Sequence, residues 1–527
     1  MVAVQLGAFG CGEFSSDPDA ASDAAQATSD APQDTSTGPS DSSAGDAAKD
    51  AKPPPDGSPD APFDAKQDVN ILDGGSDADA TLDAPKDGPS DAPFDTGTDA
   101  AAEAGVVDAG PDAAIVIPQL AFKAVELISV STSGAQANAD CDSVRASDDK
   151  RFVTFFSAAS NLVVGDTNAS SDVFIRDRAL STTKLVSLAQ SGVANGGSHG
   201  GFITGSGTHV VFVSSASNLV AGDTNGKDDG FIFNVASAAM ERVTIPSGGG
   251  EANNNSDVMV VSDDGRFVAF ESDATNLVTG DTNGATDIFL RDRTQNTTIR
   301  VSVGAGGVQA NGLSRRPHMT GDGRFVVYES DATNLVTGDT NGVRDTFAYT
   351  VATQATLRLS ETAQAVQGNG LSDRVTMSST GLFSVFRSAA TNLVAGDTNN
   401  LIDFFRVSNS TPREVVRLGS SQASFATARA TISTNGNVVV TETTDSFLKS
   451  ADQNGVSDIY IWDLTAAPVT QTLVSTASNG NAGNGASIGP FITSDGTHVV
   501  YRSAATNLNG ITDTNGFADV FLSRILQ

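Results

Sequence analysis

One recurring phrase constrains the fold of this chain more than any other feature. Asp-Thr-Asn-Gly-x-x-Asp, intact or slightly altered and followed by an apolar pair, begins at Asp166, Asp223, Asp281, Asp339, Asp397, Asp452 and Asp513. The spacings between copies are 57, 58, 58, 58, 55 and 61 residues. A period of several tens of residues indicates a solenoid, an array or a propeller, because each copy is one unit that packs on the next.

Each copy contains four short runs that are rich in apolar and β-branched residues. In the third copy they predict strands at residues 256–262, 266–272, 287–292 and 299–303. Asp264-Gly265 joins the first two runs and predicts a two-residue hairpin turn, in which both central residues take positive φ. Four antiparallel strands without helical periodicity are typical of a propeller blade.

The ends of the repeat region predict a closed ring. The last copy has no fourth strand after residues 519–525, whereas residues 126–131 form a spare strand-like run before the first copy. If this run completes the last blade, no sheet edge stays open. We therefore predict an all-β fold, with a seven-bladed β-propeller at residues 119–527.

The beginning of the chain has a different composition. Residues 1–113 hold 24 of the 63 acidic residues and 12 of the 18 prolines. Such a segment cannot bury enough apolar area to offset the conformational entropy lost on folding, so we expect residues 12–118 to be a disordered acidic linker.

A possible anchor lies just before this linker. Residues 6–12, Leu-Gly-Ala-Phe-Gly-Cys-Gly, resemble the end of a bacterial lipoprotein signal, although Ala8 and Phe9 depart from the usual pattern. The resemblance implies a truncated signal segment at residues 1–11, lipidation of Cys11 and a place at the outer membrane or cell surface. A secreted chain or a cytosolic protein with an incidental Cys11 is the alternative.

The strand phrases themselves resemble a known family. Residues 262–272, Ser-Asp-Asp-Gly-Arg-Phe-Val-Ala-Phe-Glu-Ser, and Asp-Ile-Phe-Leu-Arg-Asp at 287–292 resemble the WD40-like repeat of TolB-type propellers. The resemblance covers about residues 126–525. It implies a propeller in the cell envelope, and TolB itself is a periplasmic protein-binding component whose extra N-terminal domain is not recognisable here. Propellers host binding proteins and enzymes alike, so the resemblance leaves the function open.

The Asp phrase lies in a loop between the second and third strands of each copy. Alternating oxygen ligands, a Gly at the turn and a later Asp are how acidic loops wrap Ca²⁺. The phrase also resembles the inner part of the calcium loops of dockerins and integrin-type propellers. That resemblance implies binding through the side chains of Asp281, Asn283 and Asp287, and through the carbonyl of Ala285. Thr279 replaces the first acid of the family loop, so another loop must supply oxygens, and Asn253 is a candidate.

The predicted calcium ligands are the two Asp and the Asn of each copy. They are Asp166, Asn168, Asp172, Asp223, Asn225, Asp229, Asp281, Asn283, Asp287, Asp339, Asn341, Asp345, Asp397, Asn399, Asp403, Asp452, Asn454, Asp458, Asp513, Asn515 and Asp519. The alternative is that these side chains only cap turns.

The charge and the motifs restrict the function. A net charge of -32 without a basic cluster argues against nucleic acid. No nucleophile elbow or metalloprotease motif occurs in the sequence, and we assign no catalytic residue. We predict a monomeric, non-enzymatic module that binds a protein or glycan at its loop face and contacts the membrane only through the lipid anchor. The alternatives are a propeller hydrolase or lyase with a metal at the channel mouth, and a TolB-like component of an envelope complex. Arg315 and Arg316 are either part of a ligand site near the channel or solvated loop charges.

Overall fold

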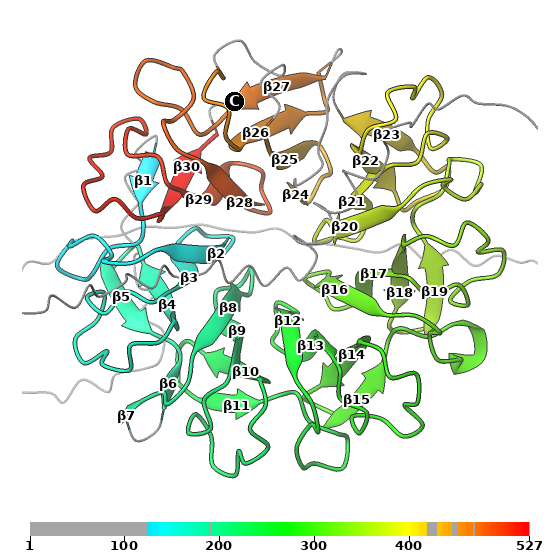
Figure 1. Ribbon diagram of the computed structural model, residues 1–527, viewed down its shortest axis with the longest axis horizontal. Coiled ribbons are helices and arrows are strands. Elements are labelled where there is room, and N and C mark those ends of the chain that lie inside the picture. Colours follow the sequence, from blue (N-terminus) through cyan, green and yellow to red (C-terminus); the bar gives the residue numbers. More distant parts are fainter. Residues whose placement is uncertain (1–124, 190–191, 419–428, 445–451, 467–468, 526–527) are drawn as a thin grey trace, which may run out of the picture. The chain divides into compact units, whose positions relative to one another are not determined.

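A computed structural model describes residues 125–189, 192–418, 429–444, 452–466 and 469–525. In this part, seven four-stranded antiparallel sheets form blades around a central channel (Figure 1). The predicted seven-bladed β-propeller is therefore confirmed. The predicted signal segment 1–11, the lipidation of Cys11 and the linker 12–118 lie outside the described residues.

Each blade is built from an innermost, a second, a third and an outer strand. The innermost strands of blades 1 to 7 are β2 (Cys141–Ala146), β8 (Ser198–Ile203), β12 (Ser256–Val261), β16 (Ser314–Met319), β20 (Ser372–Met377), β24 (Ala430–Ile432) and β28 (Ser487–Ile492). The second strands are β3 (Phe152–Ser157), β9 (His209–Ser214), β13 (Phe267–Ser272), β17 (Phe325–Ser330), β21 (Phe383–Ser388), β25 (Val438–Thr443) and β29 (His498–Ser503). The third strands are β4 (Asp172–Asp177), β10 (Asp229–Asn234), β14 (Asp287–Asp292), β18 (Asp345–Thr350), β22 (Asp403–Ser408), β26 (Asp458–Asp463) and β30 (Asp519–Arg524).

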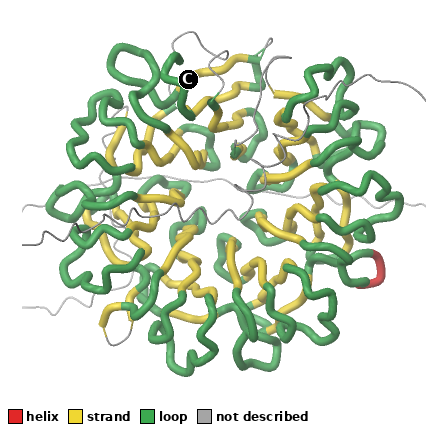
Figure 2. Tube along the Cα trace, in the orientation of Figure 1, coloured by secondary structure: helices red, strands yellow, loops and turns green. Residues whose placement is uncertain are grey.

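The outer strands follow the same order, and the seventh comes from the start of the repeat region. They are β5 (Thr182–Leu185), β11 (Met240–Arg242), β15 (Thr297–Arg300), β19 (Ala355–Arg358), β23 (Val415–Leu418), β27 (Thr470–Leu473) and β1 (Val125–Leu127). The hairpin of β6 (Leu188–Ala189) with β7 (Gly192–Val193) and the short 3-10 helix η1 (Ala305–Gly307) lie between blades. Figure 2 shows that strands and loops make up nearly all of the ring. None of the described helices is long and apolar enough to cross a membrane.

The ring closes as the sequence predicts. Strand β1 pairs with β30, where Leu127 faces Phe521, and the Ile128 amide donates to the Val520 carbonyl at 2.8 Å. The innermost strand of each blade contacts that of the next blade, including β2 with β28. The closing strand is shorter than the predicted run 126–131, because the Val130 amide turns back to the Ile128 carbonyl.

A repeated aromatic pair fills the core of the blades. In blade 3 the rings of Phe270 and Phe289 stack with centroids 5.8 Å apart, and equivalent pairs occur in blades 1, 2, 4, 5 and 7. Blade 6 has Thr441 in place of the first ring, and the buried Trp462 donates its indole N–H to Thr441 at 2.9 Å. Each blade thereby buries its apolar faces against its neighbours, which is the main favourable term in folding.

Two local predictions were wrong. The fourth strand of the third copy is Thr297–Arg300 rather than residues 299–303, because Val303 leaves the ladder and bridges to Gln309. Asp264-Gly265 is not a two-residue turn: the Ser262 amide donates to the Phe267 carbonyl at 2.9 Å, so the loop is longer. Of the dipeptide, only Gly265 has a positive φ, of 70°.

Candidate functional site: the Asp loops and the central channel

The Asp loops are held by a network of hydrogen bonds within each loop. In blade 3 the amide of Asn283 donates to Asp287 Oδ2 at 2.9 Å, and its Oδ1 accepts the Ala285 amide at 3.1 Å. The Oδ1 of Asp287 accepts from the Ser302 hydroxyl at 2.6 Å. The Asn-to-Asp bond recurs in all seven loops. The Asn oxygen therefore stabilises its own turn, as the capping alternative expects.

The blades differ in what lies beside the two carboxylates of the loop. In blade 3, Arg300 Nη1 lies 3.1 Å from Asp281 Oδ1 and 3.2 Å from Asp287 Oδ2. Arg242, Arg358 and Arg417 occupy this position in blades 2, 4 and 5. Leucines occupy it in the other blades, and these are Leu185 in blade 1, Leu473 in blade 6 and Leu127 in blade 7. A guanidinium thus neutralises the pair in four blades, at the place where calcium was predicted.

In blades 6 and 7, where no arginine lies beside the carboxylates, burial raises the pKa of the final Asp, as it also does for Asp403 beside Arg417 in blade 5. Burial, with the charge of Asp452 adding to it, raises the pKa of Asp458 to about 7. Burial likewise raises the pKa of Asp519 to about 6, with Asp513 contributing. The buried atoms Asp452 Oδ1 and Asp513 Oδ2 have no hydrogen-bond partner. Two carboxylates offer fewer oxygens than the six to eight that Ca²⁺ prefers. Among the described residues, no three His, Cys, Asp or Glu side chains lie close enough together to bind one metal ion. Calcium binding stays a prediction.

The second set of loop asparagines fastens neighbouring loops together. Asn253 donates its backbone N–H to Asn276 Oδ1 at 3.0 Å and its side-chain amide to Thr275 Oγ1 at 2.8 Å. Its own Oδ1 accepts the Thr275 amide at 2.9 Å. Both loops therefore lie on one face, as expected, but the side-chain oxygen of Asn253 accepts the Thr275 amide at the start of the Asp loop and contacts none of the predicted ligands Asp281, Asn283 and Asp287. The equivalents Asn138, Asn195, Asn311, Asn369 and Asn484 form the same bonds.

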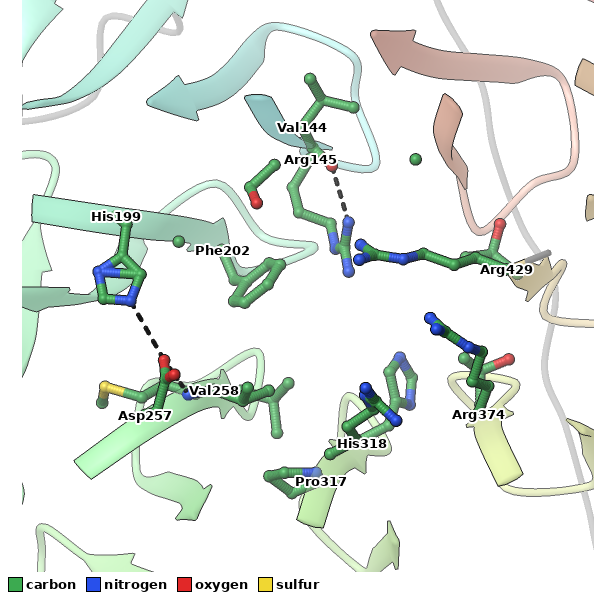
Figure 3. A pocket seen from close by; sticks show the side chains of 18 of the residues that line it. Val144, Arg145, His199, Phe202, Asp257, Val258, Pro317, His318, Arg374 and Arg429 are labelled. Carbon is green, nitrogen blue, oxygen red and sulfur yellow. Dashed lines mark hydrogen bonds and ion pairs between the residues drawn. The ribbon is translucent and has the colours of Figure 1, made fainter. Parts of the chain in front are cut away.

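A cavity of about 170 Å³ lies in the central channel, lined by residues of the innermost strands (Figure 3). Six of these strands have a β-bulge beside the cavity, and their left-handed residues are Ser143, Gly200, Val258, Arg316, Arg374 and Gly489. A bulge sets two residues of one strand against one of its partner and redirects the side chains. In five of the bulged strands, the second and third residues are half-buried and the fourth residue is buried. In β20, only the third of these two residues is half-buried.

Three arginines occupy equivalent repeat positions in consecutive blades, two of them at a bulge. Arg316 and Arg374 lie in β16 and β20, and Arg429 directly precedes β24. Arg315 and Arg316 thus lie in strand β16 rather than in a loop, and Arg374 and Arg429 are the counterparts of Arg316 in blades 5 and 6. Their spacings of 58 and 55 residues follow the repeat, so an alignment of the first strands would have found them.

Glutamates of the preceding blade, buried or half-buried, hold three of the bulges. Glu271 Oε2 accepts the Arg316 amide at 2.7 Å, and Glu329 Oε2 accepts the Arg374 amide at 2.6 Å. Glu442 accepts the Gly489 amide in the same way. Burial raises the pKa of Glu271 to about 7. These contacts join residues 45 to 47 positions apart, and no local sequence pattern announces them.

A fourth arginine enters the channel from blade 1. The guanidinium of Arg145 lies 4.3 Å from the ring centre of Phe202 and 5.0 Å from that of Phe491, on the two neighbouring blades. Figure 3 shows the guanidinium groups of Arg145 and Arg429 facing each other. Burial, together with the charge of Arg429, lowers the pKa of Arg145 to about 9. Burial and Arg145 also lower the pKa of His318 to about 4.

The acids that line the cavity already have basic partners. Asp257 Oδ1 lies 3.2 Å from His199 Nε2, and Asp142 Oδ2 lies 3.5 Å from Arg502 Nη1. Other residues with reactive side chains lie elsewhere: His209 and His498 begin β9 and β29, and Cys141 is buried in the core.

No protein-family model and no curated protein matches this chain. Several solved structures are similar to it. An oligogalacturonate lyase in complex with manganese has 11% identity and a TM-score of 0.45, over 76% of this chain and 91% of that chain. The oligogalacturonate lyase of Vibrio parahaemolyticus has 10% identity and a TM-score of 0.45, over 76% and 90%. TolB of Acinetobacter baumannii has 12% identity and a TM-score of 0.34, over 68% and 76%. At these identities the likeness concerns the fold alone.

Proposed function

We propose that this protein is a non-enzymatic binding module of the cell envelope, whose ligand enters the central channel from the face that carries the Asp loops. The observation that carries the proposal is the cavity in the channel, into which Arg145 and Arg429 point. Ligand sites are typically concave, with a few polar groups that fix orientation. The protein or glycan predicted from the sequence would present one part of itself to this cavity.

The register of the strands places the cavity near the Asp loops. Asp257, on the cavity wall, pairs with Glu271, and β13 ends one residue later at Ser272, where the Asp loop begins. The paired loops form the rim around that end of the channel. A ligand that reached the arginines would therefore also contact the loop face.

The rival function is a hydrolase or lyase, and one observation favours it. His199 and Asp257 form an ion pair on the cavity wall, and such a pair can act as an oriented base. Two contacts support binding instead: Phe156 packs edge-on against the His199 ring with centroids 6.5 Å apart, and His318 Nδ1 accepts the Met377 amide at 3.4 Å. Arg145 and Arg429 form no ion pair in the part of the chain that the structure describes, so both can donate to a ligand.

A panel of glycans and envelope proteins, incubated with the full chain, tests the proposal. We expect saturable binding of one ligand per chain, with the ligand recovered unchanged by mass spectrometry. New products that disappear in His199→Ala would show an enzyme and contradict the proposal. Selective binding of an envelope protein would still be binding without conversion, and it would favour a TolB-like component of an envelope complex over a glycan-binding module.

Calcium belongs to this proposal only as a stabiliser of the rim. The leucines Leu473 and Leu127 at the arginine position support it in blades 6 and 7, because no guanidinium there takes the place of a cation. Lipidation of Cys11 remains a proposal about location, since Cys11 lies outside the described residues.

A further inference from the structure

We propose that Arg145 and Arg429 together bind an oxyanion, a carboxylate or a phosphate, in the central channel. This inference rests on the proposed function and names the chemistry of its ligand. The two residues come from blades 1 and 6, 284 positions apart in the sequence, and Figure 3 shows their guanidinium groups facing each other across the cavity.

Neither arginine has an ion pair with a carboxylate among the described residues. Arg145 donates to its own neighbour, the Val144 carbonyl, at 2.8 Å and stacks on two phenylalanine rings. Arg429 is exposed to the channel. The contrast with nearby arginines is clear, since Arg387 forms a buried bidentate pair with Asp373 and Arg316 Nη1 lies 2.8 Å from Glu329.

No acid around the cavity forms an ion pair with Arg145 or Arg429 in the described part of the chain, although Arg429 favours the charged form of Glu442. Asp257 and Asp142 are bound to His199 and Arg502. The charge of Arg429 acts to lower the pKa of Glu442, but the carboxylate of Glu442 accepts a hydrogen bond from the Gly489 amide of the next blade. Two guanidinium groups that face each other in a partly buried channel repel, and an anion between them would turn this repulsion into two attractions. Burial is the main cause of the lowered pKa of Arg145, and the charge of Arg429 adds to it.

The geometry and the size of the cavity restrict the ligand. A guanidinium is planar and carries donors in a fork that fits the two oxygens of a carboxylate or phosphate. Phe202 and Phe491 hold the plane of Arg145 in place. The cavity of about 170 Å³ is smaller than the roughly 300 to 1,000 Å³ of sites for whole drug-sized ligands. It therefore accommodates one acidic group, with the rest of the ligand outside.

Calorimetric titration of the full chain tests the inference with two probes, inorganic phosphate and glucuronate. We expect one site for at least one probe, and the tighter probe distinguishes phosphate from carboxylate. Arg429→Gln should weaken the binding about tenfold or more, the size expected for a lost charge-assisted pair. Arg429→Lys should recover only part of it, because lysine keeps the charge but not the fork.

The control is Arg324→Gln, which changes an exposed arginine paired with Asp322 away from the cavity and should leave binding unchanged. Because Arg429 is exposed, its replacement should leave the thermal melt as it is. No saturable binding of either probe up to about 10 mM, where even a 1 mM site would saturate, contradicts the inference. The inference is also contradicted if Arg429→Gln binds the probe with the same affinity as the unaltered chain. Either result leaves the binding module intact, since that proposal fails only if the panel ligands are converted or none binds.

Discussion

At the scale of single residues, the blades differ in how they treat two buried carboxylates. Arg300 lies between Asp281 and Asp287 in blade 3, whereas blade 6 has Leu473 at the same position. Two carboxylates buried without a cation destabilise each other's charged forms. The blades thus share the same backbone structure but differ in the charges that surround the two loop carboxylates.

This difference predicts an effect of Asp452→Asn that depends on pH. The folded pKa of Asp458, about 7, lies above the unfolded value of about 3.9. Its contribution to stability is therefore present at low pH and is lost as the pH rises through about 7. Removing the charge of Asp452 should raise the free energy of unfolding at pH 8 by about 1 kcal/mol and change it little at pH 5. Urea unfolding in the presence of a chelator at both pH values measures this.

The matched control is Asp281→Asn in blade 3. It should lower the stability at pH 8, because Arg300 loses one of its two buried partners. The same pair of variants also tests whether blade 6 binds Ca²⁺. If blade 6 binds Ca²⁺, calcium raises the melting temperature of the unaltered chain and Asp452→Asn loses part of that rise. An identical melt in calcium and in chelator would rule out the calcium proposal.

At the scale of elements, the innermost strands combine regular pairing with strained bulges. Val258 has a φ of 30°, which is unfavourable for a β-branched residue. The Val258 amide donates to Asp257 Oδ1 at 2.8 Å, whereas glutamates of the preceding blade hold the bulges at Arg316, Arg374 and Gly489. Strain of this kind is often kept where side chains must point into a site.

Val258→Gly should therefore stabilise the protein. Relief of about 1 to 3 kcal/mol of backbone strain exceeds the roughly 0.5 to 1 kcal/mol that glycine costs through the unfolded chain. We expect a net gain of about 1 kcal/mol in the free energy of unfolding, measured with urea. Val260→Gly, in the same strand but outside the bulge, should be destabilising. A loss of stability in both variants would show that Val258 is not strained.

The strands and their order could be predicted because each blade repeats a pattern that is local in sequence. The bulges could not, because they depend on bonds such as that from Arg316 to Glu271 of the preceding blade. Arg145 was missed for a related reason: it lies in the fifth position of β2, whereas Arg316, Arg374 and Arg429 share another repeat position. Of the residues that line the cavity, only Arg316 was named from the sequence, and one of its two alternatives placed it in a ligand site near the channel.

At the scale of the whole ring, closure creates the site. Arg145 belongs to blade 1 and Arg429 precedes the first strand of blade 6, so blade 7 lies between them. Blade 7 is complete only when β1 pairs with β30. The strand that closes the circle therefore also fixes how the two guanidinium groups face each other.

Hydrogen exchange of the segment 125–130 in the full chain tests this closure most directly. The Ile128 amide, bonded to the Val520 carbonyl at 2.8 Å, should exchange as slowly as the amides of β30. Exchange of this segment at the rate of an unpaired chain, while β30 stays protected, would contradict a ring closed by β1.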